Sequence, residues 1–202
     1  MAISATQVKA LRDKTGVGFM DCKSALTEAD GDLDKAVTIL RTRGVARAAK
    51  RAGRTTSQGL VGNYVHQGGQ VGVLVEVACE SDFVARTDEF QHLAREIAMH
   101  IAAANPQYVT RDEVPSEDIE REKTIFRAQF EASNKPAHVI DKIVDGKINS
   151  YYQQVVLLDQ PSIRDPKVSI GDLVTAAVAK LGEDAVRQVA RVLRHEIDAD
   201  PF

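Results

Sequence analysis

The sequence predicts an α+β protein in which a helical module precedes a core that combines a small antiparallel sheet with helices. Three observations support this class. Apolar residues recur at helical spacing near the N-terminus, two strand-like apolar runs flank a Gly-Gly pair, and helical spacing returns in several later segments. The chain has 202 residues, 44% of them apolar and 5% aromatic, so its core is expected to be mostly aliphatic.

Three short helices are predicted in the N-terminal module. The first covers residues 4–14, because Ser4 and Gln7 form the signature of a capping box. A Thr-Gly-Val-Gly sequence then interrupts the pattern, and a second helix is predicted from Phe19 to Ala29. The third begins at Leu33, after an Asp-Gly-Asp turn, and three helices of this size can share one small core.

Phe19 and Met20 stand at the start of the second helix, beside the glycine-rich turn. Two interpretations fit them. They are either a local hydrophobic staple across the helix start or an exposed apolar patch for a partner. Periodicity alone does not separate the two.

Charge divides the chain into two parts. Residues 1–54 carry 11 basic and 6 acidic side chains, whereas residues 55–202 carry 15 and 23. We therefore predict a helical module with a basic linker helix over 1–54 and an α+β core over 55–202. The basic run contains no acid and no aromatic residue, so a solvated surface is favoured over nucleic-acid binding. Its members are Arg41, Arg43, Arg47, Lys50, Arg51 and Arg54.

A β-hairpin is predicted over residues 58–79, because the Gly68-Gly69 pair separates two strand-like runs. Valines alternate along the second run, which indicates one buried face. Four helices follow in the periodic pattern, and a second capping box, Ser169 with Asp172, opens the last of them. Their expected ranges are about 82–104, 116–133, 136–156 and 169–181. The segment 186–197 fits both a helix and a strand.

Several classes of function are disfavoured. The sequence has no apolar run of membrane-spanning length and no targeting segment at its start, so a cytoplasmic location is expected. Cys22 and Cys79 are far apart and are read as buried thiols. No zinc spacing, cofactor fingerprint, nucleotide loop or catalytic constellation occurs. We expect no metal, no cofactor and no enzyme activity, and an interaction protein fits better.

Three blocks of the sequence resemble bacterial elongation factor Ts, in its short form. They are the segment Thr15–Asp32 (Thr-Gly-Val-Gly-Phe-Met-Asp-Cys-Lys-Ser-Ala-Leu-Thr-Glu-Ala-Asp-Gly-Asp), the motif Ser81–Arg86 (Ser-Asp-Phe-Val-Ala-Arg), and the block from Lys135 to Pro166. The resemblance implies that the first module is a ubiquitin-associated-like three-helix bundle. It also implies a final strand near 186–197, which brings the sheet to about three strands. The long coiled-coil hairpin and duplicated core half of longer members are expected to be missing.

The resemblance implies a guanine-nucleotide exchange factor for elongation factor Tu in translation elongation. Such a factor binds the GDP form, displaces Mg²⁺, promotes GDP release and is itself released when GTP binds. It makes and breaks no covalent bond. Elongation factor Tu, in its GDP-bound and nucleotide-free forms, is then the expected partner. A homodimer is a further expectation, whereas membrane contact and direct nucleic-acid binding are not expected.

The resemblance also assigns the contact residues. Ser81, Asp82, Phe83 and Val84 match the motif that displaces Mg²⁺ in the GTPase. In the N-terminal module, the positions that contact its nucleotide domain are Arg12, Phe19, Met20 and Lys23. The chain departs from the family pattern in using Ser81 for Thr, Arg86 for Lys, and Ser162 and His195 where aromatic residues are usual.

Other interpretations remain at this stage. Phe83 stands seven residues before Phe90, so one continuous helix would place both rings on the core face. Asp82 fits a helix N-cap or a first-turn acid as well as a contact residue. The basic run leaves a nucleic-acid adaptor as an alternative function, and the first module leaves a ubiquitin-type binding module.

Overall fold

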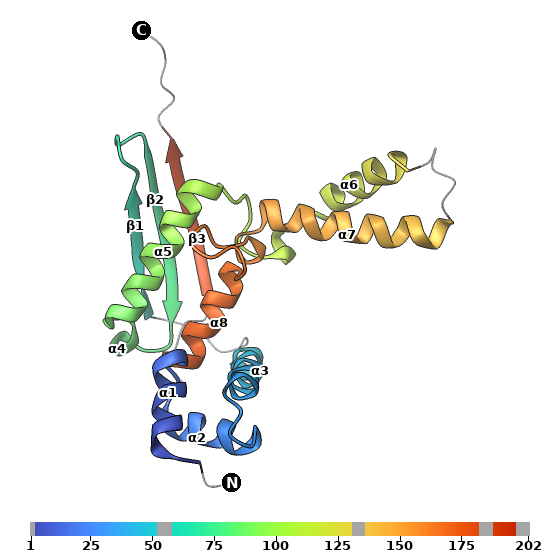
Figure 1. Cartoon of the computed structure of the whole chain (residues 1–202). Helices are drawn as coiled ribbons and strands as arrows, with labels where there is room; N and C mark the ends of the chain where they lie inside the picture. Colours follow the sequence, from blue (N-terminus) through green and yellow to red (C-terminus); the bar gives the residue numbers. More distant parts are fainter. Residues whose placement is uncertain (1–2, 52–57, 131–135, 182–187, 197–202) are drawn as a thin grey trace.

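The computed structural model describes residues 3–51, 58–130, 136–181 and 188–196, with side chains described throughout these ranges except 47–51 and 188–196. The α+β class is confirmed. Figure 1 shows three parts: a bundle of helices at the N-terminus, a sheet with helices across one face, and a two-helix hairpin that projects away from the sheet. None of the described helices is long and apolar enough to cross a membrane.

The N-terminal bundle consists of α1 (Ala5–Thr15), α2 (Phe19–Glu28) and α3 (Leu33–Arg51). The capping box of Ser4 and Gln7 is present at the start of α1, as the sequence predicts. The turn between α2 and α3 is capped by Asp32, whose Oδ1 accepts hydrogen bonds from the backbone N–H groups of Asp34 and Lys35. The buried apolar side chains of the bundle form a core of their own: Val8, Leu11, Val17, Cys22, Ala25, Leu26, Ala29, Ala36 and Leu40.

The sheet has the strand order β1-β2-β3, and both pairs of neighbours are antiparallel. Its strands are β1 (Gln58–Val65), β2 (Val71–Cys79) and β3 (Gln188–Glu196). The segment whose spacing fitted both helix and strand thus lies beside β2 as an extended strand. The alternating residues of β2 face one side and are buried: Val73, Val75, Val77 and Cys79.

Helices α5 (Asp88–Ala104) and α8 (Ile170–Leu181) pack with this buried face. The second capping box is present: Ser169 Oγ accepts from the N–H of Asp172, and the Asp172 carboxylate accepts from the N–H of Ser169. The expectation of one helix over 82–104 is wrong. A short helix α4 (Asp82–Ala85) comes first, and α5 starts anew after Thr87, whose hydroxyl accepts from the N–H of Phe90.

The projecting hairpin consists of α6 (Ser116–Ala128) and α7 (Ala137–Val155). Helix α6 ends five residues before the predicted position 133. Two short 3-10 turns lie at the base of the hairpin: η1 (Arg111–Glu113) and η2 (Leu157–Asp159). The resemblance to short-form elongation factor Ts implies that the long coiled-coil hairpin of the longer proteins is missing. In this chain α6 and α7 form a hairpin of 13 and 19 helical residues. Its buried residues form a third core: Val114, Ile119, Val144, Ile148, Val155 and Val156.

Candidate functional site

Phe83 lies on the outside of the molecule. It is 79% exposed, whereas Phe90 is completely buried. The break between α4 and α5 explains the difference, because the two rings no longer share one helical face. Ser81 caps α4 with its hydroxyl, which accepts a 3.2 Å hydrogen bond from the Phe83 N–H. The interpretation in which both rings face the core is therefore wrong.

Asp82 lies beside Phe83, and its side chain is 46% exposed. Its carboxylate lies 3.0 Å from a guanidinium nitrogen of Arg86, one turn further along the chain. Arg86 is largely in solvent and Asp82 is partly exposed, so this pair contributes little to stability and leaves part of the carboxylate accessible to a partner. The Asp-Phe pair is thus presented outward on a single capped turn.

Val84 differs from the other members of this motif, because it is buried in the core of the sheet. The buried Val84 side chain and the Ser81 cap together anchor the α4 turn to the core of the sheet. The Cys79 thiol donates a 3.1 Å hydrogen bond to the Ser81 carbonyl, which ties the end of β2 to the same turn. Burial raises the pKa of Cys79, so the thiol stays protonated and inert at neutral pH. Both cysteines are buried and free, as expected.

The second group of predicted contact residues lies on the N-terminal bundle. Arg12, Phe19, Met20 and Lys23 are all exposed, Phe19 by 46% and Met20 by 71%. For Met20, exposure of this size fits an apolar surface patch better than a hydrophobic staple across the helix start. A shallow hollow of about 400 Å³ lies beside it, lined by Met20, Lys23, Ser24, Thr27 and Glu28.

The turn that precedes α2 is built by short-range hydrogen bonds. The Thr15 hydroxyl donates to the Leu11 carbonyl, and the buried Cys22 thiol donates to the Val17 carbonyl. Gly16 ends α1 with φ at +69°, a conformation that glycine adopts without a steric penalty. This compact turn fixes where Phe19 and Met20 emerge.

Helix α8 connects the bundle with the core. Arg41 of α3 forms a 3.0 Å ion pair with Asp172, and Gly44 packs against Ala179. Partial burial raises the pKa of Asp172, but the hydrogen bonds from Arg41 and from Ser169 outweigh it, so the pKa is lowered overall. The two exposed groups, around Phe83 and around Met20, are thus carried on parts that contact one another.

The basic run of α3 is partly engaged within the protein. Besides the pair made by Arg41, the Arg43 guanidinium contacts Glu28 at 2.5 Å and Ser24 at 3.2 Å. Arg41 and Arg43 are thus paired with carboxylates of the protein itself, whereas a nucleic-acid site would need their charges for phosphates. The remaining members of the run lie outside the residues whose side chains are described.

His100 is a buried residue that sequence reasoning left unassigned. It is 1% exposed, its Nε2 lies 2.9 Å from Gln160 Oε1, and its Nδ1 has no hydrogen-bond partner among the described residues. Burial lowers the pKa of His100, although Gln160 and Glu96 oppose the shift. Gln160 also donates to the Gln154 carbonyl, which connects α5 with the base of the hairpin. No spacing signal in the sequence pairs these residues.

The comparisons with known proteins agree across nearly the whole chain. A family model described as "Elongation factor TS" matches residues 33–198. The chain belongs to the elongation factor Ts family. The protein named elongation factor Ts from Fervidobacterium nodosum is 54% identical over 98% of this chain and 99% of its own length. Its counterpart from Geobacter sulfurreducens is 50% identical over 97% of this chain and 91% of its own length.

Membership of the elongation factor Ts family identifies the chain as an elongation factor of protein biosynthesis. The match to the Caldanaerobacter subterraneus relative, 54% identical over 96% of this chain, includes the N-terminal bundle that the family model leaves out in part. Both groups of exposed residues thus lie within the length shared with relatives.

Proposed function

We propose that this protein is a guanine-nucleotide exchange factor for elongation factor Tu. The observation that carries the proposal is the outward position of Phe83, which is 79% exposed on a capped turn beside an accessible carboxylate. Covering a large aromatic side chain with a partner surface is energetically favourable, so an exposed ring held on a capped turn suits a protein contact. Membership of the elongation factor Ts family supports the identity of the partner.

In this mechanism Asp82 and Phe83 enter the GTPase next to its bound Mg²⁺. Burial of the Phe83 ring contributes about 1.5–3 kcal/mol. Because 1.4 kcal/mol corresponds to a tenfold change in affinity, this one contact weakens GDP binding by roughly ten- to a hundredfold. The protein forms no covalent bond with the nucleotide.

The N-terminal bundle supplies the second contact. We propose that it is a ubiquitin-associated-like module whose exposed Arg12, Phe19, Met20 and Lys23 bind the nucleotide domain of the GTPase. Their apolar and basic character suits a mixed protein surface. Together the two contacts hold Asp82 and Phe83 in the GTPase with more free energy than Phe83 supplies alone.

Release of the factor follows from thermodynamic linkage. A protein that weakens GDP binding is weakened by GDP to the same degree, and the same reciprocity holds for GTP. Rebinding of nucleotide therefore ejects the factor, and GTP completes the cycle when it is in excess. We place this cycle in the cytoplasm, where elongation takes place.

A homodimer is part of the same proposal. Val61, Val65 and Leu74 are exposed by 60%, 66% and 48% on the sheet face opposite to α5. An apolar sheet face of this kind is stabilised when a second sheet covers it. Sedimentation velocity over a range of protein concentrations tests this part separately.

The decisive experiment measures the release of fluorescently labelled GDP from elongation factor Tu. The full chain should accelerate release in proportion to its concentration until it saturates, and excess GTP should free the factor again. Absence of any acceleration contradicts the proposal. RNA binding that declines steeply with salt would instead favour the adaptor function that the basic run leaves open.

A further inference from the structure

Strand β1 has a free edge within the described part of the chain. It is the outer strand of the sheet, and among the described strands it pairs with β2 alone. Hydrogen-bonded and non-hydrogen-bonded pairs alternate along an antiparallel ladder. The N–H of His66 donates to the Val71 carbonyl at 2.8 Å, so the register assigns the other bonded positions to Leu60, Gly62 and Tyr64. The N–H and C=O groups of Val61, Asn63 and Val65 therefore point away from the sheet.

This edge lacks the features that usually protect one. Proteins block free strands with lysine, proline, bulges or inward charges, because an open edge pairs readily with other chains. Strand β1, with the sequence Gln-Gly-Leu-Val-Gly-Asn-Tyr-Val, has no charged residue and no proline, and its pairing with β2 is continuous over all eight residues. The three outward-pointing residues make no other backbone hydrogen bond within the described chain.

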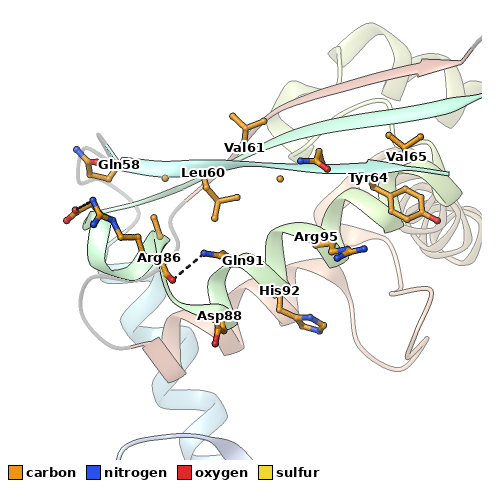
Figure 2. A pocket seen from close by; sticks show the side chains of 15 residues that line it. Gln58, Leu60, Val61, Tyr64, Val65, Arg86, Asp88, Gln91, His92 and Arg95 are labelled. Atoms are coloured by element: carbon orange, nitrogen blue, oxygen red, sulfur yellow. Dashed lines mark hydrogen bonds and ion pairs between the residues drawn. The ribbon is translucent and has the colours of Figure 1, made fainter. Parts of the chain in front are cut away.

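A groove of about 930 Å³ runs along this edge (Figure 2). One wall is β1, and the other is formed by the start of α5 and the end of α4. Gly62 makes the close approach possible, since a Cβ at this position would lie 2.9 Å from the Ala94 carbonyl oxygen of α5. A groove between an edge strand and a helix is the arrangement in which extended peptides are bound as an added strand.

The helical wall carries an unused cation. Arg95 is exposed, lines the groove and forms no ion pair with any described residue. His92 lies near it, 3.9 Å from Glu96, while Asp88 is at the far end of the wall in the first turn of α5. An acidic side chain on a bound strand, directed toward the helix, would meet Arg95 at this position.

We propose that β1 and this groove bind an extended segment of a partner protein as a fourth strand, with an acidic side chain directed at Arg95. Backbone hydrogen bonds to Val61, Asn63 and Val65 hold the segment, and Arg95 selects its charge. The proposed strand contacts and Arg95 use neither Phe83 nor Met20, although Asp82 lines one end of the same groove.

The test uses the full chain labelled with ¹⁵N and two synthetic peptides. Both peptides are eight residues long and alternate valine or threonine with a charged residue, which is glutamate in one and lysine in the other. The glutamate peptide should slow amide exchange at Val61, Asn63 and Val65 by about tenfold or more, and should leave Gly62 and Tyr64 unchanged. An absence of added protection at these three amides overturns the proposal.

Two variants separate the backbone and the charge. Asn63→Pro removes an outward N–H without touching the bonds to β2, so peptide binding should fall about tenfold while the melting temperature stays nearly the same. Arg95→Glu should weaken the glutamate peptide and strengthen the lysine peptide, each by several-fold. Equal binding of both peptides by the native chain contradicts the role of Arg95.

A modified peptide keeps the test independent of protein folding. Methylation of alternate backbone nitrogens in the glutamate peptide removes the donors that would face β1, and binding should be lost. If the methylated peptide binds equally well, no strand is added and the proposal is wrong. Protection that rises with protein concentration without peptide, and that is confined to the outward amides of Val61, Asn63 and Val65, identifies a second copy of the chain at the edge and also overturns the proposal.

Discussion

Lys180 and Glu89 form an ion pair that joins α8 to the first turn of α5, with Lys180 Nζ 2.6 Å from Glu89 Oε1. The stem of the same lysine fills the space above Gly16, where an added Cβ would collide with Lys180 Cε. One side chain therefore contacts both the turn that precedes Phe19 and the helix that follows Phe83. In this way it fixes the position of the two proposed contact groups relative to each other.

Lys180→Met should slow nucleotide exchange several-fold and leave stability almost unchanged. Both partners of the ion pair are 40–50% exposed, so the pair contributes at most about 1 kcal/mol to folding. Its loss nevertheless frees the bundle to move against α5. The measurement is GDP release at limiting and at saturating factor. Lys123→Met, which removes an exposed pair with Glu120 on α6, is the matched control and should change neither quantity.

Phe83→Ala should reduce exchange by at least about tenfold without weakening the fold. A side chain that is 79% exposed loses almost no packing when truncated, and surface changes of this kind stay within about 0.5 kcal/mol. Phe90→Ala is the contrasting variant, because this ring is fully buried and its removal should cost about 3–5 kcal/mol. Unfolding in urea and labelled-GDP release, measured on both variants, separate the two effects. If Phe83→Ala exchanges nucleotide at the normal rate, insertion of Phe83 into the GTPase does not drive GDP release.

Gly62→Ala should destabilise the protein by about 1–3 kcal/mol. The added methyl group would meet the carbonyl oxygen and carbon of Ala94 at 2.9 and 3.0 Å, and a helix backbone does not yield as a flexible side chain does. Thermal unfolding measures the loss. Gly72→Ala is a suitable control, since no atom among the described residues lies within 4 Å of a Cβ built there. An equal effect of both substitutions would contradict the close approach of α5 to β1.

His100 should make the protein less stable as the pH falls below about 6.5. Its pKa is lowered in the folded state, so below the unfolded value the unfolded chain takes up a proton that the folded chain does not. Stability is then lost by up to about 1.4 kcal/mol per pH unit until the folded pKa is reached. Glu96 is the charged group that favours the protonated form, and it limits the effect.

The check is urea unfolding at several pH values between 5 and 8, with His100→Gln beside the native chain. The variant should show a flatter dependence in this window, because it has no proton to take up. His66→Gln, a change at an exposed position, should leave the slope as it is. A native slope that His100→Gln does not alter would assign the pH dependence to other groups.

Local signals predicted most of the elements. Both capping boxes, the hairpin around Gly68-Gly69 and the buried face of β2 follow from short-range patterns, and each is present in the structure. The apolar spacing does not reveal the break after α4, and the reason is physical. Ser81 and Thr87 are both good caps, and the apolar spacing continues across them, so the pattern does not show that both caps are used.

The sequence does not predict how the residues of the candidate site are arranged in space, for a different reason. The residue types of the Asp82-Phe83 pair were visible, but their exposure depends on the break in the helix. The Lys180–Glu89 pair and the His100–Gln160 pair join residues far apart in the chain. Such contacts depend on how helices pack, which spacing along one element does not encode.

The separate core of the α6–α7 hairpin has a consequence for how this architecture can change. The buried residues of the hairpin pack among themselves and not in the core under the sheet. Added helical turns would lengthen both helices by about 5.4 Å each and disturb no residue that covers the strands. The hairpin is therefore a place where evolution can extend or shorten the molecule while the rest of the framework stays constant.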